Sequence, residues 1–325
     1  MEKKVLILSQ SYVEGTTDAV CLWLDYYRFP FIRLNGEDYF KLKKLGDLPQ
    51  DEQIGLVWYR RKLGRTPAHY TLKKESFEVR YVMRRFLIDE FNTLHSLLFY
   101  SIDKKKWLND PIIEDHLNKL NVLFLAKKLQ LNIPYSEVLT DKQSLMEMLQ
   151  QYPHLIVKPL NECVLLEDAD QTYYRMLTKS INEKDIKSIP DTFFPSLVQE
   201  RINKKFEVRV FYLAGTFYSM AIFSQSNKKT VADFRNYDNK RPNRNVPYKL
   251  PNEIESKLKR LMKELNFETG SIDLMVDMEG NYIFLEINPA GQFGMVSYPC
   301  NYYLEKKMAQ LFIQTSTKYE KKVHQ

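Results

Sequence analysis

Three side chains near the end of the sequence, two carboxylates and one amide, could bind a metal ion. Asp273 precedes the pair Glu279-Gly280, and Glu286 and Asn288 follow it. The flanking segments are rich in apolar residues, and glycine tolerates the positive φ that a tight turn requires. The sequence therefore predicts an antiparallel hairpin centred on Glu279-Gly280.

The register of this hairpin decides which polar side chains meet. Centring it on that pair places Asp277 opposite Tyr282, Asp273 opposite Glu286, and Ser271 opposite Asn288. Opposed carboxylates repel one another, whereas oxygen ligands on one face are what Mg²⁺ requires. The alternative is a solvated polar face of an edge hairpin. The loop Pro289–Gly294 favours the metal site, because a flexible loop directly after the ligands suits a place where substrate and metal-bound phosphate meet.

Cationic residues on two further predicted strands could serve an anionic ligand. Lys158 is embedded in Leu155–Pro159, where its burial is costly unless it meets an anion such as phosphate; the alternative is an edge-strand lysine that reaches water. Glu207 and Arg209 share one face of a strand that turns at Ala214-Gly215 into a second strand. This carboxylate and guanidinium could serve a ribose and a phosphate, or pair with each other.

The first hundred residues alternate strand and helix. Apolar runs predict strands at 5–8, 31–34 and 54–59, with a helix over 18–28 and a long helix over 77–102. This order indicates a small α/β module. Arg60 and Arg61 follow the third strand, where open α/β sheets bind ligands; a solvated loop is the alternative reading.

The middle of the chain is predicted to hold one further helix and one long polar run. Asp110-Pro111 is typical of a helix start, and the pattern continues to about Gln130 with Leu117, Leu120 and Phe124 on one face and Lys119 beside it. Residues 228–249 are polar and basic without apolar periodicity, which indicates a functional or disordered loop. Helices are expected over 253–265 and 302–317.

Size and composition narrow the classes of protein. A chain of 325 residues with 44% hydrophobic and 13% aromatic residues is long enough for two or three modules. The net charge of +7 permits anionic partners but selects none. Three widely spaced cysteines indicate reduced thiols and a cytoplasmic setting, and no segment is typical of a signal peptide or a membrane span.

The order of these residues resembles the ATP-grasp superfamily over about 110–315. The matching series is Lys119, Lys158, Gln199–Ile202, Glu207-x-Arg209, Arg235, and Asp273 followed by Glu286-x-Asn288. The segments Val57–Arg61, Asp233–Arg235 and Glu286–Phe293 are most similar to those of the microviridin-ligase-like graspetide synthetases. That family installs side-chain ester or amide cross-links in ribosomally made peptides.

The resemblance implies an α/β (α+β) ATP-grasp fold in three domains. An N-terminal pre-ATP-grasp domain would span 1–108, a central lid domain 109–198, and a C-terminal domain with the metal site 199–325. The nucleotide would be held between the last two domains. The chain departs from many relatives because Leu160–Asp170, where a phosphate-binding flap is expected, has no glycine.

The resemblance also assigns roles to the matching residues. Lys119 and Lys158 would contact the phosphates of ATP, Glu200, Arg201 and Ile202 the adenine, and Glu207 the ribose. Asp273, Glu286 and Asn288 would bind two Mg²⁺ ions. Arg209 and Arg235 would stabilise the transferred phosphoryl group. Independently of the resemblance, the charges of Arg60, Arg61 and the basic run that contains Arg244 favour an acidic substrate, which these three residues would contact.

The activity implied is ATP-dependent ligation of a precursor peptide that carries a leader segment. A carboxyl group of Asp or Glu would become an acyl-phosphate, which a Thr or Ser hydroxyl or a Lys amine would then attack. The alternatives are a small-molecule carboxylate–amine ligase, like glutathione synthetase, and a non-enzymatic nucleotide-binding regulator. No nucleic-acid or membrane partner is expected, and the sequence leaves open whether the protein is a homodimer.

Overall fold

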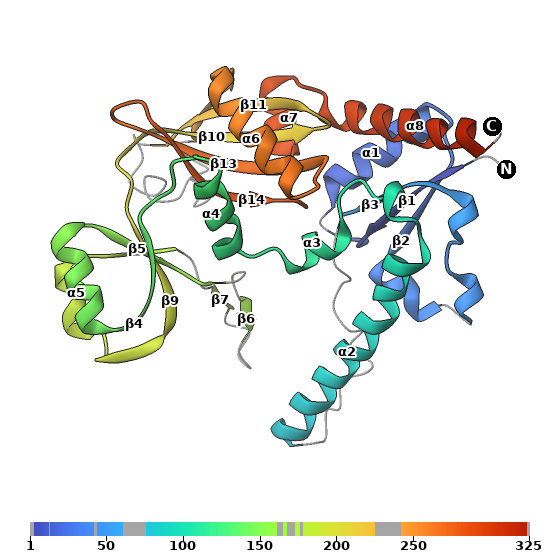
Figure 1. Ribbon diagram of the computed structural model, residues 1–325. Helices are drawn as coiled ribbons and strands as arrows, with labels where there is room; N and C mark the ends of the chain where they lie inside the picture. Colours follow the sequence, from blue (N-terminus) through green and yellow to red (C-terminus); the bar gives the residue numbers. More distant parts are fainter. Residues whose placement is uncertain are drawn as a thin grey trace. The chain divides into compact units, whose positions relative to one another are not determined.

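The computed structural model describes residues 3–12, 14–41, 44–60, 76–160, 165–167, 173–175, 178–224 and 242–323 (Figure 1). The chain forms two compact units. Unit 1 comprises Met1–His116, Leu265–Gly270 and Pro289–Gln325, and unit 2 comprises Leu117–Glu264 and Ser271–Asn288. The division into three domains that the sequence suggested stays a prediction. None of the helices in the described ranges combines the length and the apolar character needed to cross a membrane.

Unit 1 is built on a parallel sheet with the strand order β2-β1-β3. Its strands are β1 (Lys4–Ser9), β2 (Phe31–Asn35) and β3 (Ile54–Tyr59), and its helices are α1 (Gly15–Tyr26), α2 (Phe77–Ser101), α3 (Pro111–His116), α7 (Gly294–Cys300) and α8 (Leu304–Val323). The expected α/β alternation is therefore confirmed.

The two faces of this sheet are buried by different parts of the chain. Leu6 and Leu8 pack into a cluster with Leu98 of α2 and with Trp107. The other face lies against α8, because the ring of Trp58 in β3 is 5.2 Å from the ring of Phe312. Burial on both faces explains why the strands read as continuous apolar runs.

The single helix expected over 110–130 is wrong. Asp110 does accept hydrogen bonds at the start of α3, from the backbone N–H groups of Ile112 and Ile113, but α3 ends at His116. A second helix, α4 (Lys119–Lys128), begins after Asn118, whose side chain accepts from the Asn121 N–H. This internal cap interrupts the pattern.

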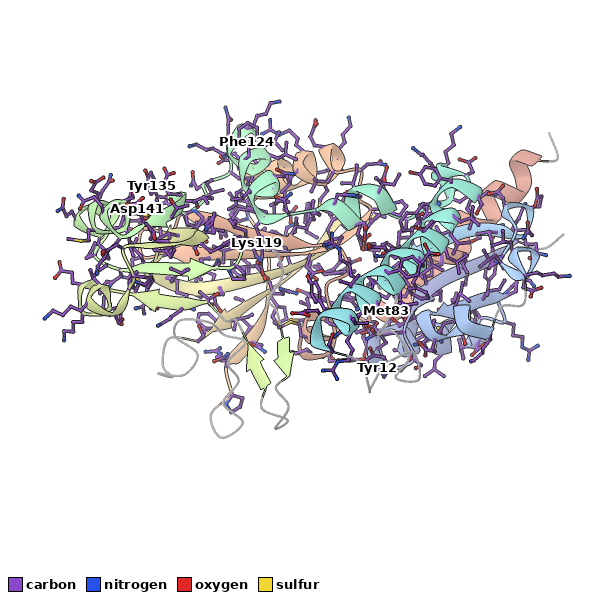
Figure 2. The ribbon with its side chains drawn as sticks, turned by 90° about the horizontal axis from the view of Figure 1, so that it is seen from below. Tyr12, Met83, Lys119, Phe124, Tyr135 and Asp141 are labelled. Atoms are coloured by element: carbon purple, nitrogen blue, oxygen red, sulfur yellow. The ribbon has the colours of Figure 1, made fainter. Side chains whose placement is uncertain are left out.

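The new helix start also changes which side of α4 is buried. Val122, Leu123 and Ala126 are buried, whereas Leu120 and Phe124 are 38% and 74% exposed. Phe124 and Lys119 are labelled in Figure 2. The expected apolar face of Leu120 and Phe124 is therefore wrong, because the spacing i, i+3, i+7 was counted through the break at Asn118.

Unit 2 holds two larger sheets and a small two-stranded one. The first has the order β4-β9-β5-β8 and packs against α5 (Lys142–Gln151) and the helical turn Glu183–Ser188. Its strands are β4 (Ser136–Asp141), β5 (Leu155–Lys158), β8 (Lys179–Ile181) and β9 (Thr192–Glu200). β6 (Leu165–Glu167) pairs with β7 (Tyr173–Arg175).

The second sheet has the order β12-β11-β10-β13-β14. Its strands are β10 (Lys204–Leu213), β11 (Thr216–Phe223), β12 (Arg244–Tyr248), β13 (Thr269–Asp277) and β14 (Tyr282–Asn288), and α6 (Asn252–Glu264) precedes β13. β12 corrects one expectation, because the run 228–249 was read as loop throughout. Pairing with β11 makes residues 244–248 a strand, while 225–241 lie outside the described residues.

Candidate nucleotide and metal site

The β13–β14 hairpin has the predicted register at its ligand-bearing end. Asp273 lies opposite Glu286, and Ser271 lies opposite Asn288. The two carboxylates and the amide therefore face one another across neighbouring strands. Asp273 is buried, Glu286 is half-buried and Asn288 is exposed.

The tip of the hairpin differs from the prediction by one residue. Val276, not Asp277, lies opposite Tyr282, and the Asp277 N–H donates to the Asn281 carbonyl at 3.0 Å. The Asp277 carboxylate accepts from the N–H groups of Glu279 and Asn281, and Gly280 has φ +91°. The turn is thus a three-residue loop with glycine in the left-handed position.

A β-bulge restores the register between the tip and the ligands. Leu274 pairs with Phe284, whereas Asp273 pairs with Glu286, so Leu285 is the extra residue. The one-residue offset at the tip and the bulge cancel. The sequence-based pairing of Asp273 with Glu286 was therefore correct although the turn was not.

Asp273 forms a buried ion pair with Arg209 of β10. One terminal nitrogen of the guanidinium lies 2.5 Å from each carboxylate oxygen, and the two side chains are 9% and 10% exposed. A second buried pair joins Lys204 and Glu207 on the same strand. Glu207 and Arg209 thus each pair with a different neighbour and not with one another.

A pocket in unit 2 brings together four of the residues expected to bind nucleotide. Its lining comprises Pro134, Ile156, Lys158, Glu200, Arg201, Ile202, Lys204, Met275 and Leu285. The apolar members suit a flat aromatic ring, and the two lysines suit phosphate oxygens. The pocket also contains residues of β13 and β14, the strands that carry Asp273 and Glu286.

Backbone hydrogen bonds fix the segment that enters this pocket after β9. Glu200 accepts at Oε1 from the Tyr135 N–H at 2.8 Å, and its own N–H donates to the Tyr135 carbonyl. The Arg201 N–H donates to the His154 carbonyl at 2.9 Å. These hydrogen bonds therefore fix residues 200 and 201, which line the pocket together with Ile202.

Sequence reasoning did not single out Lys204. It is the first residue of β10 and is buried. Extending the alternation of that strand by two residues would have placed Lys204 on the side of Val208 and Val210, both of which are buried.

The remaining predicted residues are spread over both units. Lys119 begins α4 and is not among the residues that line the described pocket. Arg244 begins β12 with its guanidinium 5.8 Å from the centre of the Phe223 ring. Arg61 and Arg235 lie outside the described residues.

Arg60 is buried in unit 1, with 2% of its side chain exposed. Its Nε lies 3.2 Å from Glu14 Oε2, and one terminal nitrogen donates to Thr16 Oγ1 at 3.0 Å. The other donates to the carbonyls of Ala290 and Gly291. Arg60 is thus neither in a solvated loop nor at the surface.

The oxygen ligands fit a hard cation such as Mg²⁺. Within the described ranges no three His, Cys, Asp or Glu side chains come together, so Asp273 and Glu286 form a pair to which Asn288 adds an amide oxygen. Magnesium sites that also take substrate phosphates use one or two carboxylates. The donor set therefore suits a metal ion that is shared with a bound nucleotide.

The structure has the ATP-grasp fold, as comparison with solved structures shows. The RiPP-associated ATP-grasp ligase of Chryseobacterium gregarium, in complex with ADP and a leader and core peptide, superposes with a TM-score of 0.79 at 23% identity, covering 96% of this chain and 97% of the other. The expected fold is confirmed. No protein-family model matches the sequence, and no curated protein does.

Two further structures have the same fold. The macrocyclase MdnC of Microcystis aeruginosa MRC, bound with precursor peptide MdnA, has a TM-score of 0.78 at 22% identity over 96% of this chain and 99% of its own. The ATP-grasp ligase PsnB, complexed with a phosphomimetic variant of minimal precursor, Mg and ADP, has a TM-score of 0.74 at 16% identity over 97% and 99%.

Proposed function

We propose that the protein is an ATP-dependent carboxylate ligase of the graspetide-synthetase type, which joins side chains of a precursor peptide. The single observation that carries this proposal is the pairing of Asp273 with Glu286 on a hairpin that also lines a pocket with two lysines. The structures with the same fold support it, because their names describe ligases and macrocyclases that bind precursor peptides and ADP.

The nucleotide would occupy the pocket of unit 2. Its base would lie against the apolar residues and the segment 200–202, whose backbone would form hydrogen bonds with the ring. Lys158 and Lys204 would face its phosphates, with Lys119 and Arg235 proposed as further phosphate-binding cations. Glu207 would accept hydrogen bonds from ribose hydroxyls beside its partner Lys204.

Asp273, Glu286 and Asn288 would hold two Mg²⁺ ions. When bound, these ions neutralise phosphate charge and favour displacement at the γ-phosphorus. Arg209 would contribute its own positive charge from beside Asp273. The chain thus surrounds the site of transfer with fixed charges that need little rearrangement during the reaction.

The proposed reaction has two steps. A carboxylate oxygen of a substrate Asp or Glu attacks the γ-phosphorus of ATP, which releases ADP and leaves an acyl-phosphate. A hydroxyl of Thr or Ser, or an amine of Lys, then attacks the acyl carbon, loses its proton and expels phosphate. Water must be excluded between the steps, because it would hydrolyse the intermediate.

The substrate is proposed to be a peptide with a leader and a core segment, because the Chryseobacterium gregarium ligase is in complex with a leader and core peptide and MdnC is bound with a precursor peptide. Arg244, which is exposed, and Arg61 are the proposed contacts for its acidic side chains. We place the protein in the cytoplasm, where ATP and precursor peptides are made; the described cysteines, Cys21 and Cys300, are free thiols. Light scattering would decide whether it acts as a homodimer.

Mass spectrometry tests this function. A precursor encoded beside the gene, with a tail rich in Thr and Asp or Glu, is incubated with enzyme, ATP and Mg²⁺. Each bond formed should remove one water mass and release one ADP. The Glu286→Gln variant is the control. Ligation of free amino acids with no change in the peptide would instead support the small-molecule ligase.

A further inference from the structure

The hairpin that carries the proposed metal ligands leaves and rejoins unit 1 at two adjacent points. Gly270 belongs to unit 1 and Ser271 to unit 2; likewise Asn288 belongs to unit 2 and Pro289 to unit 1. Ser271 and Asn288 are opposite one another in the ladder. The course of the chain at the ligand-bearing end of the hairpin therefore depends on how unit 1 holds the segments on either side.

Unit 1 holds the segment after Asn288 through the buried guanidinium of Arg60. It donates to the carbonyls of Ala290 and Gly291, the second and third residues beyond Asn288. The centre of the Phe293 ring lies 5.8 Å from the guanidinium carbon. The segment from Pro289 to Phe293 is thus held by contacts with the buried guanidinium of Arg60.

Polar side chains from the start of α1 complete this network. Glu14 is fully buried and accepts from Thr17 at 2.7 Å, while Thr16 donates to Gln292 Oε1 at 2.7 Å. Gln292 Nε2 donates weakly to Glu14 at 3.4 Å. A buried ion pair contributes little net stability, so its value lies in the geometry that it imposes.

Asn109 holds the segment before Ser271 in the same way. Its Oδ1 accepts from the N–H groups of Glu268 and Thr269 at 2.9 and 3.0 Å, and its Nδ2 donates to the Thr269 carbonyl at 3.2 Å. Both chain segments adjoining the hairpin are therefore fixed to unit 1 by buried side chains.

We propose that Arg60 is a positioning residue for the magnesium site: it fixes the chain directly beyond Asn288, while Asn109 fixes it before Ser271. This inference rests on the proposed function. Arg60 would then act through Ala290 and Gly291 on the placement of Asn288 and Glu286 and would not itself contact substrate. Residues that orient metal ligands typically change metal affinity by about 10- to 100-fold when they are replaced.

The test compares Arg60→Met with Arg33→Met. Arg33 is a matched control, because it is an arginine of unit 1 that donates hydrogen bonds to Asp18, Asn35 and the Gln10 carbonyl instead of to the carbonyls after Asn288. Mg²⁺ affinity is measured by titration calorimetry in the presence of a non-hydrolysable ATP analogue, and thermal unfolding is recorded for each variant.

Arg60→Met should weaken Mg²⁺ binding by about tenfold or more, with ADP formation recovering as Mg²⁺ is raised to saturation. Arg33→Met should leave Mg²⁺ affinity unchanged. Should Arg60→Met fail to fold, Gln292→Ala carries the test, because it loosens the same segment without leaving a buried charge. Equal Mg²⁺ affinities in wild type and in these variants would overturn the positioning role alone. Failure of the wild-type protein to bind Mg²⁺ with the nucleotide analogue would overturn the proposed function itself.

Discussion

Replacing Asp273 with asparagine should destabilise unit 2 even in the absence of metal and nucleotide. The Arg209–Asp273 pair is about nine-tenths buried on both sides. Two unit charges about 4 Å apart attract by about 4 kcal/mol at the effective dielectric constant of 20 that suits proteins. Desolvation offsets much of this, but removing one partner leaves a buried charge and costs about 3 kcal/mol.

The double variant provides the internal check on this magnitude. Arg209→Met alone should cost a similar amount, whereas Arg209→Met combined with Asp273→Asn should cost clearly less than the sum, with a coupling energy of about 2 kcal/mol. Glu255→Gln is the matched control, because its partner Lys249 is 75% exposed and such pairs contribute less than about 1 kcal/mol.

The positions of the tryptophans allow the two units to be followed separately. Trp23, Trp58 and Trp107 all belong to unit 1, so tryptophan fluorescence reports that unit. Hydrogen exchange of β10 and β13 reports unit 2, and Asp273→Asn should accelerate it in urea while the fluorescence transition stays in place. Unchanged exchange in β10 and β13 would refute the reasoning, because the pair would then contribute nothing to the fold.

Three further predictions concern single side chains. Glu286→Gln should abolish Mg²⁺-dependent ADP formation and leave the circular dichroism spectrum unchanged; unchanged turnover would contradict the metal assignment. Lys158→Met should weaken ATP binding by about 10- to 100-fold, because it removes a hydrogen bond from a charged donor. Equal ATP affinities of the variant and the wild type in calorimetry would show that Lys158 does not bind the nucleotide. Burial raises the pKa of Glu114 from 4.5 to about 8. Between these two pH values the folded protein keeps a proton that the unfolded chain releases. The free energy of unfolding therefore falls as the pH rises through that window. Glu114→Gln should therefore gain stability over wild type at pH 8 but not at pH 4, as urea denaturation at each pH would show; a difference that does not depend on pH would exclude this titration.

The strands of unit 1 could be predicted because apolar runs are local, whereas the ligand-bearing pairs of the hairpin were right only because the offset at its tip and the bulge cancel. The break at Asn118 could not be predicted, because its cap competes with a helical pattern that continues through it. The bulge at Leu285 also escaped detection, since no glycine or proline in Tyr282–Asn288 marks it.

The candidate site also combines residues that the sequence could indicate with contacts that it could not. Lys158 was singled out from its local setting and residues 200–202 from the resemblance to ATP-grasp proteins, and these four residues line one pocket. The partner of Arg209 lies 64 residues away in sequence, and the partners of Arg60 lie 46 residues before it and about 230 after it. Such pairs depend on the fold as a whole, and no local pattern indicates them.

The close packing of α8 on β3 has a consequence for the order of folding. A Cβ atom on Gly55 would lie 2.8 Å from the Ser316 Cβ, so helix and strand touch almost backbone to backbone. The ribosome makes β1 and β3 first and α8 more than two hundred residues later. The part of β3 that α8 buries must therefore wait for its partner while all of unit 2 is synthesised, which makes it a place where a nascent chain would need a chaperone.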